Sequence, residues 1–163
     1  MGVETLRTNV LPPFFEKIRR ELIFSQIDCQ MLPSKFTQAQ FWKLALSPIE
    51  QEIKANPDSP LSQSYGDCQK SEFDAISLSK LLDNEHFGRR LVLLLDEFDT
   101  LLFHSLGTPE FWANLRALSD WPRRLVLVVS SRYPIDIMSG KIEKVDVIGS
   151  SVFQLIARRL SRI

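Results

Sequence analysis

The sequence is poor in the residues that build disulfide frameworks and zinc sites. Its 163 residues include two cysteines and two histidines. Cys29 and Cys68 lie far apart and form no CxxC pair, and neither His86 nor His104 has a Cys or His at a metal-ligand spacing. We therefore expect neither a zinc site nor a disulfide, and we expect both thiols to be reduced in the cytoplasm.

Long apolar runs and an excess of charge are also lacking. The longest apolar runs, residues 91–95 and 125–129, fall far short of the roughly 20 residues that a membrane span needs. Residues 1–10 carry polar side chains where a secretory signal has an apolar stretch. Lys plus Arg and Asp plus Glu both number 20, so no net positive charge attracts nucleic acid or anionic lipid. We therefore expect a cytoplasmic protein with no nucleic-acid or membrane partner.

What is present is the composition of one folded domain, over residues 1–163, with 44% hydrophobic and 25% charged residues. The two apolar runs, each bounded by charge, are typical of strands buried on both faces. Between them Thr108-Pro109-Glu110 predicts the start of a helix, because it supplies a capping hydroxyl, a first-turn proline and a carboxylate. A strand, a helix and a strand in this order predict an α/β fold with a parallel sheet flanked by helices.

The other segments give weaker patterns. Their predicted elements are a helix at residues 14–22, a strand at 23–29, a helix at 37–53 that Pro48 interrupts, a surface loop at 56–67, a helix at 72–84 and a short strand at 141–148.

Polar residues follow both buried strands, and ligands bind at the carboxyl ends of parallel strands. The second strand is followed by Ser130, Ser131 and Arg132. The first is followed by three carboxylates, Asp96, Glu97 and Asp99. Like charges this close need a cation, solvent or a cationic side chain as compensation.

These segments resemble a known family. Residues 91–97, Leu-Val-Leu-Leu-Leu-Asp-Glu, have the form of the Walker B motif of AAA and STAND-type P-loop ATPases, and Ser130-Ser131-Arg132 is similar to their first sensor motif. The likeness extends to the helix predicted at 110–121 and to residues 149–153, which resemble the Ser-Pro-Phe-Phe stretch of some STAND members. It covers residues 23 to about 160 and implies a three-layer P-loop NTPase-like fold.

The resemblance also implies roles and cofactors, ATP and Mg²⁺. Asp96 would hold Mg²⁺ through water, and Glu97 would act as the general base on the attacking water. Arg132 would sense the γ-phosphate with its planar fork of donors, and Ser131 would assist.

The phosphate-cradling Walker A loop of this family has no counterpart in the sequence. No Gly-Lys-Ser or Gly-Lys-Thr occurs. The nearest fragment is residues 1–6, Met-Gly-Val-Glu-Thr-Leu, where the family has Met-Gly-Lys-Thr-Ser-Leu; Val3 replaces the lysine and Glu4 would repel phosphate. We therefore expect a truncated or degenerate member, impaired in ATP binding and hydrolysis. Its sheet would lack the strand before the P-loop, leaving it marginally stable or dependent on a partner strand.

Three other interpretations of the sequence remain. In the first, Asp96 merely caps a turn, Glu97 and Asp99 are solvated, and Arg132 is a surface arginine. In the second, the chain is a non-enzymatic interaction module that binds a protein partner or a second copy through the incomplete sheet. In the third, Asp96, Glu97 and Asp99 form a Mg²⁺-dependent phosphotransfer or nuclease site without a P-loop.

Overall fold

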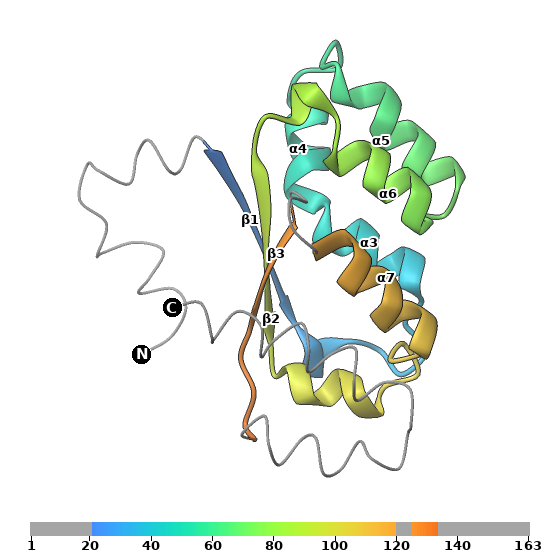
Figure 1. Cartoon of the computed structure of the whole chain (residues 1–163), viewed down its shortest axis with the longest axis vertical. Helices are drawn as coiled ribbons and strands as arrows, with labels where there is room; N and C mark the ends of the chain where they lie inside the picture. Colours follow the sequence, from blue (N-terminus) through green and yellow to red (C-terminus); the bar gives the residue numbers. More distant parts are fainter. Residues whose placement is uncertain (1–20, 120–124, 134–163) are drawn as a thin grey trace, which may run out of the picture.

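The computed structural model describes residues 21–119 and 125–133, and their centre is a parallel sheet (Figure 1). Its three strands lie in the order β1, β2, β3 and span Leu22–Asp28, Arg90–Asp96 and Leu125–Val129. Both neighbouring pairs are parallel. The predicted α/β class with a parallel sheet and flanking helices is confirmed, as are the three strands expected in this part of the chain.

The described helices pack on one side of this sheet (Figure 1). The α-helices are α3 Gln38–Ala45, α4 Ser47–Ala55, α5 Leu61–Lys70, α6 Ala75–Leu82 and α7 Pro109–Ser119. Three short 3-10 helices connect them to the strands: η1 Cys29–Met31, η2 Glu85–Phe87 and η3 Phe98–Phe103. Among the described residues, none of these helices is long and apolar enough to cross a membrane.

Local signals explain several helix ends. Thr37 and Gln40 form a capping box that starts α3, with each side chain accepting a hydrogen bond from the other residue's backbone N–H. Pro48 stands in the first turn of α4, so the interruption predicted at Pro48 within residues 37–53 is confirmed, and two helices meet at Leu46. Asp74 caps α6, which therefore begins later than the predicted residue 72.

The loop predicted at residues 56–67 is wrong in its second half, where α5 begins at Leu61. Tyr65 and Cys68 follow Leu61 at helical spacing, and all three are buried. The polar residues between them and the nearby prolines concealed this stripe in the sequence. The elements predicted at 14–22 and 141–148 fall almost entirely outside the described residues.

The core lies between the sheet and the helices. On β1, Ile23 and Ile27 are buried, whereas Phe24 on the opposite face is 48% exposed. A chain of edge-to-face ring contacts runs from Phe41 through Phe111 and Trp112 to Phe98. It joins α3, α7 and the start of η3, so the residue after Glu97 is anchored in the core.

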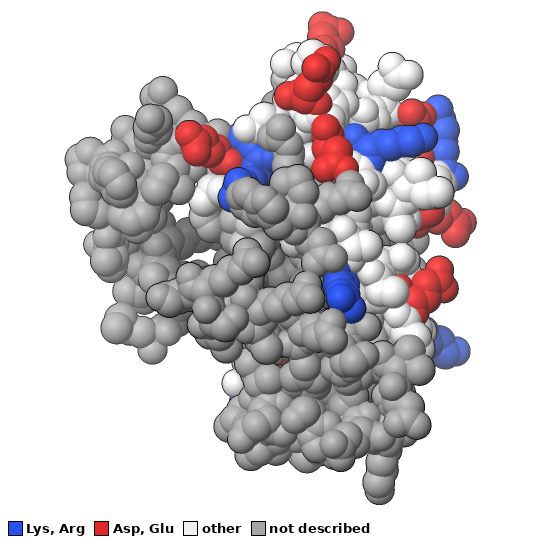
Figure 2. Space-filling model, viewed as in Figure 1, with Lys and Arg blue, Asp and Glu red and all other residues white. Residues whose placement is uncertain are grey.

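Charge is mixed on the face of the molecule that Figure 2 shows. Acidic and basic side chains lie close together among the described residues visible there.

Candidate functional site

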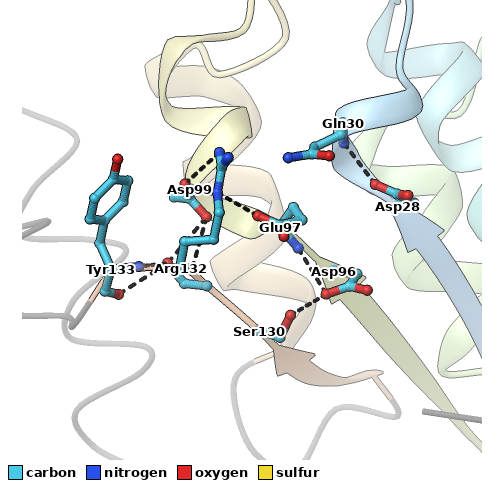
Figure 3. A network of polar contacts seen from close by, with 9 residues as sticks. Asp28, Gln30, Asp96, Glu97, Asp99, Ser130, Arg132 and Tyr133 are labelled. Atoms are coloured by element: carbon cyan, nitrogen blue, oxygen red, sulfur yellow. Dashed lines mark hydrogen bonds and ion pairs between the residues drawn. The ribbon is translucent and has the colours of Figure 1, made fainter. Parts of the chain in front are cut away.

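The carboxyl edge of the sheet carries a row of polar side chains. Asp28 at the end of β1 is paired in register with Asp96 at the end of β2. Ser130 follows Val129, which pairs with Leu95, so it extends the row by one strand. Its hydroxyl donates a hydrogen bond to Asp96 Oδ1 (Figure 3). Asp96 therefore lies between Asp28 and Ser130 at the carboxyl ends of three neighbouring strands.

Backbone hydrogen bonds fix this edge beyond the ends of the strands. The Ser130 N–H donates to Leu95 O at 2.9 Å, and the Phe98 N–H donates to Ser130 O at 2.9 Å. The Glu97 N–H donates to Asp96 Oδ1 at 3.1 Å. The segments that follow β2 and β3 are thus held together by main-chain contacts as well as by side chains.

Glu97 has an unusual backbone conformation, with φ 50° and ψ 42°. This left-handed region costs a residue with a side chain roughly 1–2 kcal/mol. Strain of this kind is common where a side chain must point in a particular direction. Here the carboxylate points to Arg132, and Glu97 Oε2 lies 2.6 Å from Arg132 Nε (Figure 3).

Asp99 is a buried anchor for the turn after β3. It is 2% exposed and accepts hydrogen bonds from Ser131 Oγ at 3.2 Å and from the Arg132 backbone N–H at 3.3 Å. The Arg132 guanidinium adds an ion pair at 3.1 Å. Burial alone would raise the pKa of Asp99, but the hydrogen bonds from the Arg132 backbone and side chain, together with the charge of Arg132, bring it below its ordinary value. The reading in which Asp99 is solvated is therefore wrong.

The edge keeps a negative electrostatic character despite Arg132. Burial, followed by the charges of Asp28, Asp96, Asp99 and Glu97, raises the pKa of the Cys29 thiol to about 12. That thiol is fully buried and stays protonated, so it is unsuited to nucleophilic chemistry. The same field would favour a cation beside Asp28 and Asp96.

The site does not by itself enclose a metal ion. Across residues 21–119 and 125–133, no three His, Cys, Asp or Glu side chains are grouped so that they could hold one. A Mg²⁺ ion at Asp96 would take its other ligands from water or from a bound molecule, as Mg²⁺ commonly does.

Two further hydrogen bonds join the loops that lie near the carboxyl ends of β1 and β2. His104 Nε2 lies 2.9 Å from Pro33 O, and Ser105 Oγ donates to Ser34 O at 2.6 Å. The His104 Nδ1 atom accepts from the Leu106 N–H at 3.0 Å, so Nε2 carries the proton. These bonds join the loop after η3 to the loop after η1.

The structure brings together most of the residues singled out in the sequence. Asp96, Glu97 and Arg132 share one edge, while Ser131 faces Asp99 instead of Asp96. Residues 1–6 and 149–153, which carry the rest of the resemblance, lie outside the described residues. Ser130 was named only as part of a motif, and Asp28 was missed. The strand predicted at 23–29 contained the signal for Asp28, because its carboxyl end had to reach this edge.

Comparisons with known proteins give no relative for this chain. No protein-family model matches it, and no curated protein or solved structure matches it significantly.

Proposed function

We propose that the chain is an ATPase-like scaffold of the AAA/STAND type whose carboxyl edge is the acidic half of a Mg·ATP site, impaired in ATP binding and hydrolysis because no Walker A loop accompanies it. One observation carries this proposal. The strands that end in Asp96 and precede Ser130 are parallel neighbours, and Asp96 contacts Ser130 while Glu97 contacts Arg132. Adjacent strand ends of this kind are where open parallel sheets bind ligands.

The residue types suit phosphoryl chemistry. Asp96, held by Ser130 and the Glu97 N–H, offers an oriented carboxylate for water-bound Mg²⁺. Glu97, the next residue, supplies a second carboxylate, at the position where the resemblance puts the general base for water. Arg132 supplies a guanidinium that matches phosphate oxygens.

The same geometry supports impaired turnover. Glu97 and Arg132 form an ion pair with each other, so neither is free for the attacking water or the phosphate.

The test is Mg²⁺-dependent binding of ATP, measured by calorimetry on the full chain, together with phosphate release. We expect weak binding that requires Mg²⁺ and is lost in Asp96→Asn, with turnover near the background rate. Asp58→Asn, at an exposed position between α4 and α5, is the matched control and should bind like the parent chain. Absence of binding at millimolar Mg·ATP would refute the nucleotide site. Hydrolysis that disappears in Glu97→Gln would refute the impairment.

A non-enzymatic interaction module is the second candidate. The observation that favours it is that β3 is an outer strand of the sheet. Among the described residues no further strand pairs with its free side, and Val128 on this strand is 47% exposed. Such a module would bind a protein partner, or a second copy, equally well with and without nucleotide, and Asp96→Asn would leave that binding unchanged. The Mg²⁺-dependent phosphotransfer or nuclease reading has less support, because the described carboxylates do not form a metal cluster.

A further inference from the structure

The strand β1 has a free edge without the features that usually keep such edges apart in water. Within the part of the chain that the structure describes, β1 is an outer strand and pairs with β2 alone. Residues 22–27 carry no charged side chain and no proline, and the register with β2 runs from Leu22 to Asp28 without a bulge. Charges, prolines and bulges are the usual protection of an outer strand. The free edge of β1 is therefore open to pairing with another strand.

A buried hydroxyl on this strand lacks a hydrogen-bond partner. Three polar or charged residues are buried in the described part of the chain, and two of them, Asp99 and Ser119, form side-chain hydrogen bonds there. The third is Ser25, in the middle of β1. It is 5% exposed, and its hydroxyl makes no hydrogen bond with a described residue. Because buried polar groups are normally hydrogen-bonded, this hydroxyl needs a partner from outside these residues.

Antiparallel pairing with a second copy of the chain supplies that partner in one register. A two-fold axis at Ser25 places the two Ser25 side chains opposite each other, and it places Ile23 opposite Ile27 of the other copy. All three residues lie on the buried face of β1. A shift by two residues would set Ser25 opposite an isoleucine, and a shift by one would turn the helices of the two copies to opposite faces. Only the register centred on Ser25 pairs hydroxyl with hydroxyl and isoleucine with isoleucine.

The other face of β1 fits the same register. Phe24 is 48% exposed on that face and would lie opposite Gln26 of the other copy. The two Phe24 rings would then be diagonal neighbours, at a separation of about 7–8 Å that aromatic side chains can bridge. Asp28, at the end of the strand, would lie opposite Leu22 and not opposite another carboxylate. The register therefore buries exposed apolar surface without setting like charges against each other.

We propose that β1 is a dimerisation strand, and that two copies of the chain pair their β1 edges antiparallel about Ser25 to form one continuous sheet. The interface goes beyond the proposed function and does not depend on it. Antiparallel pairing puts the carboxyl edges of the two copies at opposite ends of the joined sheet, so Asp96 of each copy stays outside the interface. The β3 edge lies on the far side of each copy and is not used.

Sedimentation equilibrium of the full chain over a range of micromolar concentrations measures the dimer. Phe24→Lys places a charge on both strands of the interface and is expected to weaken dimerisation at least about tenfold. Val128→Lys is the matched control, because Val128 is 47% exposed on the outer strand at the other side of the sheet. It should change the affinity less than about twofold. Circular dichroism checks that both variants fold.

Two results of this experiment would overturn the inference. One is a parent chain that stays monomeric at every concentration. The other is a dimer that Val128→Lys weakens as much as Phe24→Lys does, because the copies would then meet at β3 and not at β1.

Cross-linking tests the register independently of the lysine variants. Directly opposed residues of an antiparallel pair have Cα atoms about 4.5–5.5 Å apart, which suits a disulfide. Ser25→Cys should therefore form a disulfide-linked dimer under mild oxidation, whereas the parent chain should not, because Cys29 and Cys68 are buried. Gln26→Cys, at the next position and more exposed, should cross-link several-fold more slowly, since Phe24 of the other copy lies opposite it. Faster cross-linking of Gln26→Cys than of Ser25→Cys would rule out pairing about Ser25.

Hydrogen exchange distinguishes a second copy from another segment of the same chain. The β1 amides that point away from β2 should be protected in the dimer and should exchange rapidly once dilution yields the monomer. Protection that persists in the monomer would mean that the chain's own residues occupy this edge, and the dimerisation strand would be refuted.

Discussion

At the scale of single residues, Asp99 shows how a buried carboxylate remains ionised. Burial would raise its pKa, yet the hydrogen bonds from Arg132 and the charge of the guanidinium lower the pKa below the ordinary value. A carboxylate whose pKa is lower in the folded protein than in the unfolded chain stabilises the fold above the unfolded pKa, which is about 4. That stabilisation is lost as the pH falls through the folded pKa.

Asp99→Asn should therefore remove a pH-dependent part of the stability. The amide can still accept a hydrogen bond from the Arg132 N–H, but it cannot neutralise the guanidinium, so we expect a cost of about 2 kcal/mol at pH 7. The difference from the parent chain should shrink as the pH falls below about 4. Urea denaturation at several pH values between 7 and 3 measures it, and two curves that stay parallel over this range would contradict the assignment.

The sequence predicts the positions of the site residues better than their contacts. Asp96, Glu97 and Arg132 follow buried parallel strands, and that order alone places them at one edge. The pairing of Glu97 with Arg132 depends on the positive φ of Glu97, which no pattern in the sequence reveals. The roles of these residues in phosphoryl chemistry therefore stay predictions.

At the scale of helices and strands, the sequence predicts a helix where a capping residue or a first-turn proline marks its start. It does not predict a helix whose buried apolar residues are separated by polar ones. Thr37 and Pro48 each mark a helix start in the sequence, and both do so in the structure. The start of α5 follows Pro60 without a side-chain cap, so only its buried stripe indicates a helix. Burial of that stripe depends on packing against other elements, as in the contact of Tyr65 with Phe73, which local sequence does not specify.

The capping box of α3 gives a prediction at this scale. Thr37→Ala removes the hydroxyl that accepts from the Gln40 N–H and should lower the free energy of unfolding by about 1 kcal/mol. Thr37→Ser keeps the acceptor and should cost only a few tenths of a kcal/mol. Chemical denaturation monitored by circular dichroism compares them, and equal losses in the two variants would show that the methyl group of Thr37, and not its hydroxyl, is what matters.

At the scale of the whole molecule, the two faces of the sheet are covered to different degrees. Residues facing the described helices, such as Leu91, Leu93 and Leu125, have no exposed surface. On the opposite face Phe24 and Val128 are about half exposed, although the central Val92 is buried. The described helices pack against the first face, which accounts for this asymmetry among the described residues.

Two truncations to alanine test this asymmetry. Leu93 lies in the central strand with 0% exposure, so Leu93→Ala should cost about 3 kcal/mol through lost burial and the cavity that remains. Val128 lies in the edge strand on the other face and is 47% exposed, so Val128→Ala should cost less than about 1 kcal/mol. Denaturant unfolding of both variants measures the two losses. A cost for Val128→Ala close to that for Leu93→Ala would mean that the second face is packed as fully as the first, because a half-exposed valine has too little buried surface to lose.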